Sequence, residues 1–177
     1  MAAPTLTAAP HRSRGHRLGL VLVGLVLLVA LGACAPPRRI HTGPVPVHLV
    51  SPEMGRDLPV YQGIDTPTLN RGGVGWDDAS SGLTEPGTVV MFAHRVSHGG
   101  PFRTLNYLRP GNLVFIGGSD GRTFVYRVTL VQITPPSWTV ILAWRPSNGF
   151  GLTLVACDPP GSIRYRLVVH AELMAIS

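Results

Sequence analysis

The chain has no lysine. All fifteen of its basic residues are arginines, and with nine acidic residues they leave a formal net charge of +6. The arginines are scattered along the sequence, and the densest groups lie near the N-terminus, so there is no basic patch typical of nucleic-acid binding. We therefore expect no nucleic-acid partner. A basic surface instead favours a negatively charged cell envelope.

Cysteine is almost as scarce, because the 177 residues contain only Cys34 and Cys157. Exported proteins usually pair their cysteines in disulfides. Cys34 lies at the edge of a hydrophobic leader and is a poor partner for Cys157. An unpaired thiol outside the cell is chemically exposed, so we expect Cys157 to have a chemical function.

The one long hydrophobic run, residues 18–35, comes after a basic N-terminal segment at residues 1–17. About 18 apolar residues suit a short membrane span or a signal peptide, and the preceding basic residues predict that the C-terminal part of the chain is exported. The letters LGAC ending at Cys34 also resemble a bacterial lipobox. The run is thus a signal anchor or a lipoprotein signal with Cys34 as the lipid attachment site. Either would tether the protein to the outer face of the cell membrane.

A proline-rich linker at residues 36–45 precedes a single domain at residues 46–177. No segment of this domain has a long helical period of apolar residues, and short β-like runs recur between turns. We expect strands at residues 45–50, 58–61, 88–93, 112–116, 122–133, 140–143, 152–157 and 164–173, with one short helix at residues 102–108. Such a pattern predicts an all-β domain, either a closed barrel or a sandwich.

Three side chains that could do chemistry lie at strand ends: His94, Cys157 and Arg166. A cysteine thiolate can attack a peptide carbonyl, and a histidine can protonate the leaving amine. An arginine can donate hydrogen bonds to the charge that develops on oxygen. Each residue also has a simpler explanation. The histidine could be structural, the cysteine a small apolar core residue, and the arginine a solvated charge at the edge of a strand. The catalytic interpretation requires all three to meet at one mouth of the barrel.

Other candidates are weaker. His94 and His98 have a spacing that could bind zinc on a helix, but a strand precedes them and two glycines come directly after. We therefore expect no metal and no cofactor. Asp158 is expected to begin a turn with Pro159, and His170 is expected to be structural.

Two long segments of the domain resemble the sortases, most closely the actinobacterial class E type. LTLVAC followed by RLVVHAEL is similar to that family's cysteine and arginine signature, and PGTVVMFAHRVSHGGPFRTLNYLRPGN is similar to its histidine region. The resemblance extends over residues 46–173. It implies a closed eight-stranded β-barrel with short helices.

The resemblance assigns His94 as the family histidine, Cys157 as the nucleophile and Arg166 as the arginine. Arg164 competes for the last role, but only Arg166 directly precedes the apolar run LVV. The sequence departs from the family at Ala156, where threonine is usual. The lost hydroxyl could change turnover or substrate preference.

The implied activity is that of a cysteine transpeptidase. It would cleave an LAXTG-like or LPXTG-like C-terminal sorting signal of an exported protein and hold the product as a thioester on Cys157. An amine of a peptidoglycan precursor or a pilin would then accept the acyl group. We expect residues 138–150 to line the substrate groove. The alternative is a non-catalytic, membrane-tethered β-barrel lipoprotein that only binds a ligand.

Overall fold

A computed structural model describes residues 40–177 of the chain. The basic segment, the hydrophobic leader with Cys34 and the first part of the linker lie outside the described residues. Within residues 40–177, no helix has the length and apolar character needed to cross a membrane.

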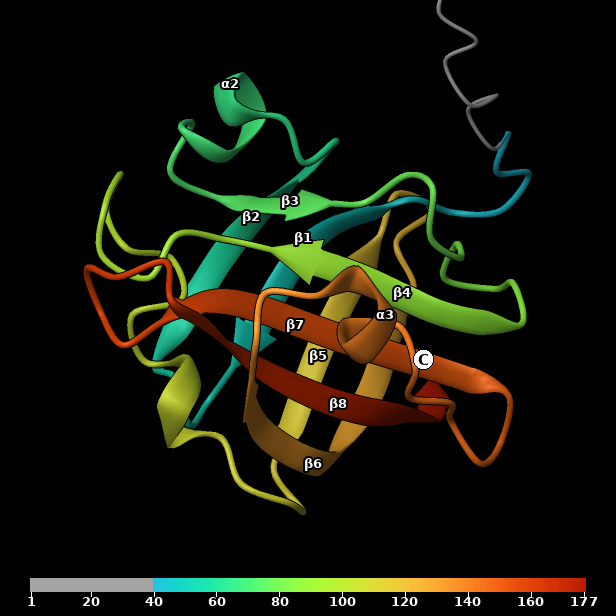
Figure 1. The fold of residues 1–177 in the computed structure, drawn as a ribbon. Coiled ribbons are helices and arrows are strands. Elements are labelled where there is room, and N and C mark those ends of the chain that lie inside the picture. The colour runs from blue at the N-terminus through green and yellow to red at the C-terminus, as the bar shows by residue number, and fades with distance from the viewer. Residues whose placement is uncertain (1–39) are drawn as a thin grey trace, which may run out of the picture. The chain divides into compact units, whose positions relative to one another are not determined.

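The described residues form a closed barrel of eight strands (Figure 1). Around the barrel the order is β1-β2-β3-β4-β7-β8-β6-β5. Two neighbouring pairs, β2 with β3 and β4 with β7, run parallel, and the others are antiparallel. The strands are β1 (Pro46–Ser51), β2 (Arg56–Gln62), β3 (Val74–Trp76), β4 (Gly87–Phe92), β5 (Leu113–Gly118), β6 (Thr123–Thr134), β7 (Phe150–Asp158) and β8 (Tyr165–Ile176). The expected all-β, closed, eight-stranded barrel is confirmed.

One expected strand is wrong and one real strand was missed. Residues 140–143 belong to α3 (Trp138–Ile141) and the turn after it. Their β-branched side chains favour a strand locally, but α3 packs its buried Ile141 against the outside of the barrel, and this tertiary contact prevails. The missed strand, β3, has only three residues and lies among glycines, which hide its pattern.

The helices of the domain are short. The expected helix at residues 102–108 is a single 3-10 turn, η1 (Leu105–Tyr107). The other described α-helix, α2 (Thr66–Leu69), begins with a capped turn in which the Asp65 side chain accepts a hydrogen bond from the Thr68 N–H at 2.8 Å. A proline in its first turn suits the same helix start.

The core fills the barrel with alternating side chains from each strand. In β6 the side chains of Phe124, Tyr126 and Val128 are buried, as the sequence alternation predicts. Leu130 continues this alternation in the sequence, but its side chain is 38% exposed. The pairing of β6 with β8 shifts register between Val128 and Leu130, and such a bulge moves the next side chains along the strand to the other face.

A second apolar cluster lies outside the barrel, where α3 covers β4, β7 and β8. Ile141 packs there with Val90, Val155 and Val168. Both faces of these central strands are therefore buried, which explains why β4 and β7 read as continuous apolar runs. In Figure 1, α3 crosses in front of this part of the barrel.

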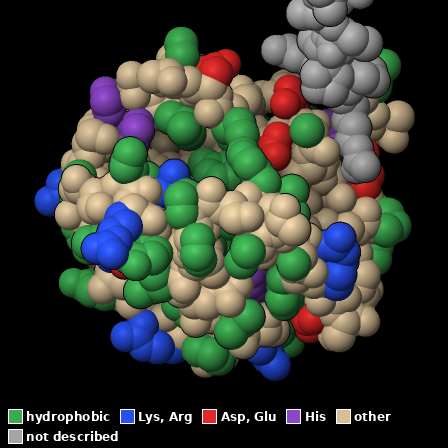
Figure 2. All heavy atoms as spheres, viewed as in Figure 1, with side chains coloured by type: hydrophobic (Ala, Val, Ile, Leu, Met, Phe, Trp, Pro, Cys, Tyr) green, Lys and Arg blue, Asp and Glu red, His purple; other side chains and the backbone are tan. Residues whose placement is uncertain are grey.

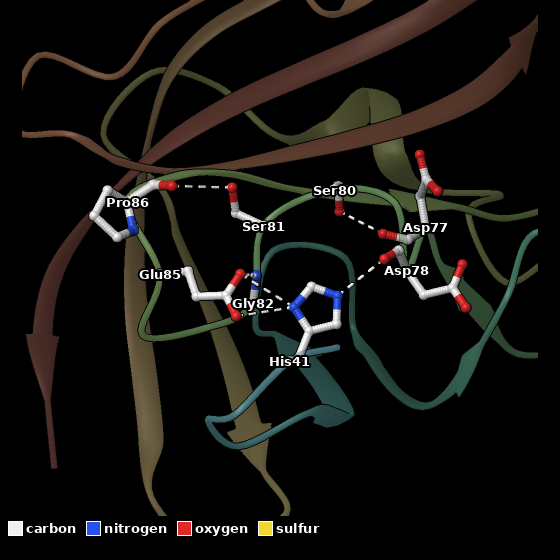
Figure 3. Close-up of polar contacts among 8 residues, drawn as sticks. All are labelled: His41, Asp77, Asp78, Ser80, Ser81, Gly82, Glu85 and Pro86. Atoms are coloured by element: carbon white, nitrogen blue, oxygen red, sulfur yellow. Dashed lines mark hydrogen bonds and ion pairs between the residues drawn. The ribbon is translucent and has the colours of Figure 1, made fainter. Parts of the chain in front are cut away.

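The segment before β1 is held to the barrel by His41 (Figure 3). Its Nδ1 lies 3.0 Å from Glu85 Oε1, and its Nε2 lies 2.9 Å from the carbonyl oxygen of Asp78. The imidazole also packs against the indole of Trp76, with ring centroids 4.7 Å apart. These contacts fix residues 40–45 against the β3–β4 connection.

Candidate active site

The barrel topology brings the ends of three strands together. His94 comes just after β4, and β4 runs parallel to β7, with Phe92 opposite Val155. The carboxyl ends of both strands therefore lie at one edge of the barrel. Antiparallel pairing of β7 with β8 places Cys157 directly opposite Arg166. Residues from three separate parts of the sequence meet because of this order of strands.

His94, Cys157 and Arg166 all line one pocket of about 260 Å³. Most of the remaining wall is apolar and comes from the α2 region, β4 and α3: Ile64, Leu69, Phe92, Pro136, Trp138 and Ile141. Figure 2 shows hydrophobic side chains gathered around a hollow on the face that carries α3 in Figure 1. An apolar pocket with a few convergent polar groups is the usual form of a small-ligand or peptide-binding site.

His94 is held by two neighbours. Its Nε2 lies 3.0 Å from Asn70 Oδ1, and its ring stacks on that of His98 with centroids 4.9 Å apart. Partial burial lowers the pKa of His94, and the nearby His98 lowers it further. The imidazole is therefore mostly neutral at neutral pH, which is the form that can accept a proton.

Cys157 is partly exposed and is a free thiol within residues 40–177. The guanidinium of Arg166, on the facing strand, donates hydrogen bonds to the carbonyl oxygens of Ile163 and Tyr165, at 2.9 and 3.0 Å. Arg164 is exposed, stacks over the ring of Tyr165 and is not part of the pocket wall. Of the two candidate arginines, Arg166 is the one beside the thiol.

An ion pair that was not predicted from the sequence joins the two residues that directly follow His94 and Cys157. Arg95 is 5% exposed, and its Nη1 donates a 2.9 Å hydrogen bond to Asp158 Oδ1. Asp158 was expected only to begin a turn, whereas it is the last residue of β7 and binds this guanidinium. The sequence contained one indication of this pair: Arg95 directly follows His94, and Asp158 directly follows Cys157.

His170 lies away from the pocket on a buried face of β8. Gln132 donates a hydrogen bond to its Nε2 at 3.1 Å, so Nδ1 carries the proton and donates to Thr153 Oγ1 at 2.9 Å. Burial lowers the pKa of His170 to about 4. Trp144 stacks on the ring with centroids 4.7 Å apart, so His170 supports the β6–β7 connection.

The expected groove at residues 138–150 contributes only its first turn to this pocket, through Trp138 and Ile141. Ala156, where the sequence resemblance implies threonine, is 2% exposed, packs in the barrel core and also lines the pocket. Within residues 40–177, no group of three or more potential ligands could hold a metal ion.

Comparisons with known proteins agree with this architecture. The family model described as a sortase domain matches residues 49–174. Sortase SrtE1 of Streptomyces coelicolor is 31% identical over 137 residues, which cover 70% of this chain and 38% of that protein. Sortase SrtE2 of the same organism is 28% identical over 67% of this chain and 51% of its own length. The chain thus matches about half or less of the length of these two curated relatives.

Solved structures of sortases share the fold. The crystal structure of sortase E1 from Streptomyces coelicolor, with a tripeptide in its active site, has a TM-score of 0.67 and 26% identity, and the match covers 78% of this chain and 93% of that one. Sortase C-1 from Actinomyces oris has a TM-score of 0.66 and 30% identity, with 76% of each chain covered. The domain match over most of the barrel decides the assignment. The chain belongs to the sortase family.

Proposed function

We propose that the protein is a cysteine transpeptidase of the cell envelope that cleaves a C-terminal sorting signal and transfers the new acyl group to an amine. The observation that carries this proposal is the shared pocket of His94, Cys157 and Arg166, with Cys157 opposite Arg166. Membership of the sortase family supports the same reaction class.

In the first step, the neutral imidazole of His94 takes the proton of the Cys157 thiol, and Sγ attacks the carbonyl carbon of the scissile peptide bond as a thiolate. Arg166 stabilises the negative charge that develops on the carbonyl oxygen. When the carbon–nitrogen bond breaks, His94 gives a proton to the leaving amine, and the acyl group remains on sulfur as a thioester.

In the second step, an acceptor amine attacks the thioester carbon. A new amide bond forms, the carbon–sulfur bond breaks, and the thiolate of Cys157 is regenerated. His94 takes the proton that the attacking amine loses, so the proton balance closes over the two steps. The two steps require only the side chains of this chain together with the two substrates.

The preferred substrate is an exported protein with an LAXTG-like or LPXTG-like signal, cleaved near the threonine–glycine bond. The apolar wall formed by Leu69, Phe92 and Trp138 suits the leucine that begins such a signal. The tripeptide in the active site of sortase E1 supports peptide binding at the corresponding place here. The acceptor is an amine of a peptidoglycan precursor or a pilin subunit.

The proposed location is the outer face of the cell membrane. Residues 18–35 would act as an uncleaved anchor, or Cys34 would carry a lipid after cleavage of the leader. The intact mass of the protein extracted from membranes separates these two forms, because lipidation with cleavage changes both the length and the mass of the chain.

The proposal is tested by transpeptidation with the full chain in detergent. The substrates are LAXTG and LPXTG peptides with a glycine-based amine, and the ligated product is measured by mass spectrometry. We expect Cys157→Ala to abolish product and His94→Ala or Arg166→Ala to lower kcat/KM by about 100-fold or more. Arg164→Ala is the matched control and keeps wild-type activity. Product formation by Cys157→Ala would overturn the enzyme assignment and favour a protein that only binds peptides.

A further inference from the structure

We propose that Asn70 is a positioning residue that holds His94 in the tautomer with its proton on Nε2. The inference rests on the proposed catalytic role of His94. The supporting contact is the 3.0 Å distance between Asn70 Oδ1 and His94 Nε2. A carboxamide oxygen can only accept a hydrogen bond, so the ring nitrogen must donate it.

The consequence for His94 comes from proton counting. A neutral imidazole carries one N–H, and Asn70 assigns it to Nε2. The lone pair therefore lies on Nδ1, which becomes the nitrogen that takes up and returns the catalytic proton. Without this contact the two tautomers would compete, and only one would present its lone pair in the productive direction.

The position of Asn70 is itself fixed by the fold. It is the C-cap of α2, and its backbone N–H donates to the carbonyl oxygen of Thr66 at 3.0 Å. Asp65 caps the other end of the same helix. The side chain of Asn70 thus extends toward His94 from an anchored turn.

Close approach of two segments supports the arrangement independently. Gly72 has a φ of +83°, and a Cβ there would lie 3.0 Å from the carbonyl oxygen of His98. The chain just after Asn70 therefore lies against the loop just after His94. Because His98 also stacks on the His94 ring, that ring is held at its edge by Asn70 and on its face by His98.

An asparagine suits this position better than an aspartate. A carboxylate beside Nε2 would stabilise the imidazolium and raise the pKa of His94. The amide instead orients the ring without adding charge. It leaves intact the lowering of the pKa of His94 by burial and by His98.

The test uses the full chain in detergent micelles with nitrogen-15-labelled histidine. The His94 signals are identified as those lost in His94→Gln. In the wild type we expect the proton on Nε2 of the neutral ring. In Asn70→Ala we expect a mixture of tautomers and a kcat about tenfold lower, with KM within about twofold, since an orienting group is lost without a substrate contact.

Asn70→Asp provides the second variant. We expect it to raise the pKa of His94 and to move the acid limb of the kcat/KM profile to higher pH by about one pH unit. Thr66→Asp is the matched control, because it adds the same charge to α2 at a residue that has no contact with His94. It keeps the wild-type tautomer and pH profile.

A proton on Nδ1 in the wild type, or an unmoved acid limb in Asn70→Asp, overturns the inference. The tautomer measurement does not depend on turnover. If Cys157→Ala retained activity, the proposed function would fail whatever the tautomer. If the three site variants lose activity but His94 carries its proton on Nδ1, only the role of Asn70 is overturned.

Discussion

The guanidinium Nη1 of Arg95 lies 2.9 Å from Oδ1 of Asp158, and both side chains are largely buried. Arg95 comes directly after His94, and Asp158 comes directly after Cys157. The ion pair thus ties the segment just after β4 to the end of β7. Arg95 also donates to Asn106 Oδ1 at 2.9 Å, which satisfies more of its buried N–H groups.

Removal of one partner of this ion pair should destabilise the barrel. Asp158→Ala leaves the buried guanidinium of Arg95 without its anion, and we expect the free energy of unfolding in urea to fall by about 3 kcal/mol. Asp158→Asn keeps an acceptor oxygen and should lose less. Asp120→Ala, at an exposed pair with Arg122, is the control and should leave the urea midpoint close to wild type. Equal midpoints for both alanine variants would contradict this role of Asp158.

His41→Ala should detach the segment before β1 from the barrel. The substitution removes hydrogen bonds to a carboxylate and to a carbonyl oxygen, and we expect a loss of about 2 kcal/mol in unfolding free energy. It also uncovers the indole of Trp76, so the tryptophan emission of the folded protein should shift to the red. His48→Ala, at an exposed contact with Asp57, is the matched control. Unchanged stability and emission in His41→Ala would show that the network does not hold this segment.

Burial of neutral His170 should make stability depend on pH. Its pKa is about 4 in the folded protein, against a usual value of 6.5. The unfolded chain therefore binds more protons between these values, and stability falls as the pH falls from about 6.5 to 4. The contribution of this group amounts to about 3 kcal/mol.

The measurement compares urea unfolding of the wild type and His170→Gln across that range. Glutamine does not titrate, so the wild type should lose about 3 kcal/mol more than the variant between pH 6.5 and 4. Other histidines titrate in both proteins, and the difference isolates His170. Parallel stability curves would exclude a depressed pKa at this residue.

Trp138 should contribute to binding more than to chemistry. It lines the pocket, is 50% exposed and contacts Phe92 edge-on with ring centroids 5.2 Å apart. We expect Trp138→Ala to raise KM for the sorting peptide about tenfold, with kcat within about threefold, because apolar contact is lost without changing the reacting groups. Leu142→Ala is the control, since Leu142 is also exposed but does not line this pocket. An unchanged KM in Trp138→Ala would place the peptide elsewhere.

The sequence predicted most of the barrel because alternation and apolar runs report directly on strand burial. The alternation of Phe124, Tyr126 and Val128 located β6, and the continuous run before His94 located β4. The bulge after Val128 has no local signature, so the outward position of Leu130 was not predictable. The failure at residues 140–143 has a similar cause, because packing of Ile141 on the barrel wall decides the structure there.

The site was predictable in part. Strand-end positions selected His94, Cys157 and Arg166, and the pocket contains all three. The contacts around these residues were not foreseen, because they join positions that lie far apart in the sequence. Asn70 is 24 residues from His94, and Arg95 is 63 residues from Asp158. Such contacts result from the order of strands around the barrel, which periodicity alone does not specify.

The most direct test of the account is the mass of the full chain during turnover of a sorting peptide without an acceptor amine. We predict a covalent acyl adduct that maps to Cys157 and disappears when a glycine-based amine is added. The adduct should be absent in Cys157→Ala and should form more slowly in His94→Ala. Peptide cleavage that proceeds in Cys157→Ser, or an adduct that maps to any other residue, would contradict the account.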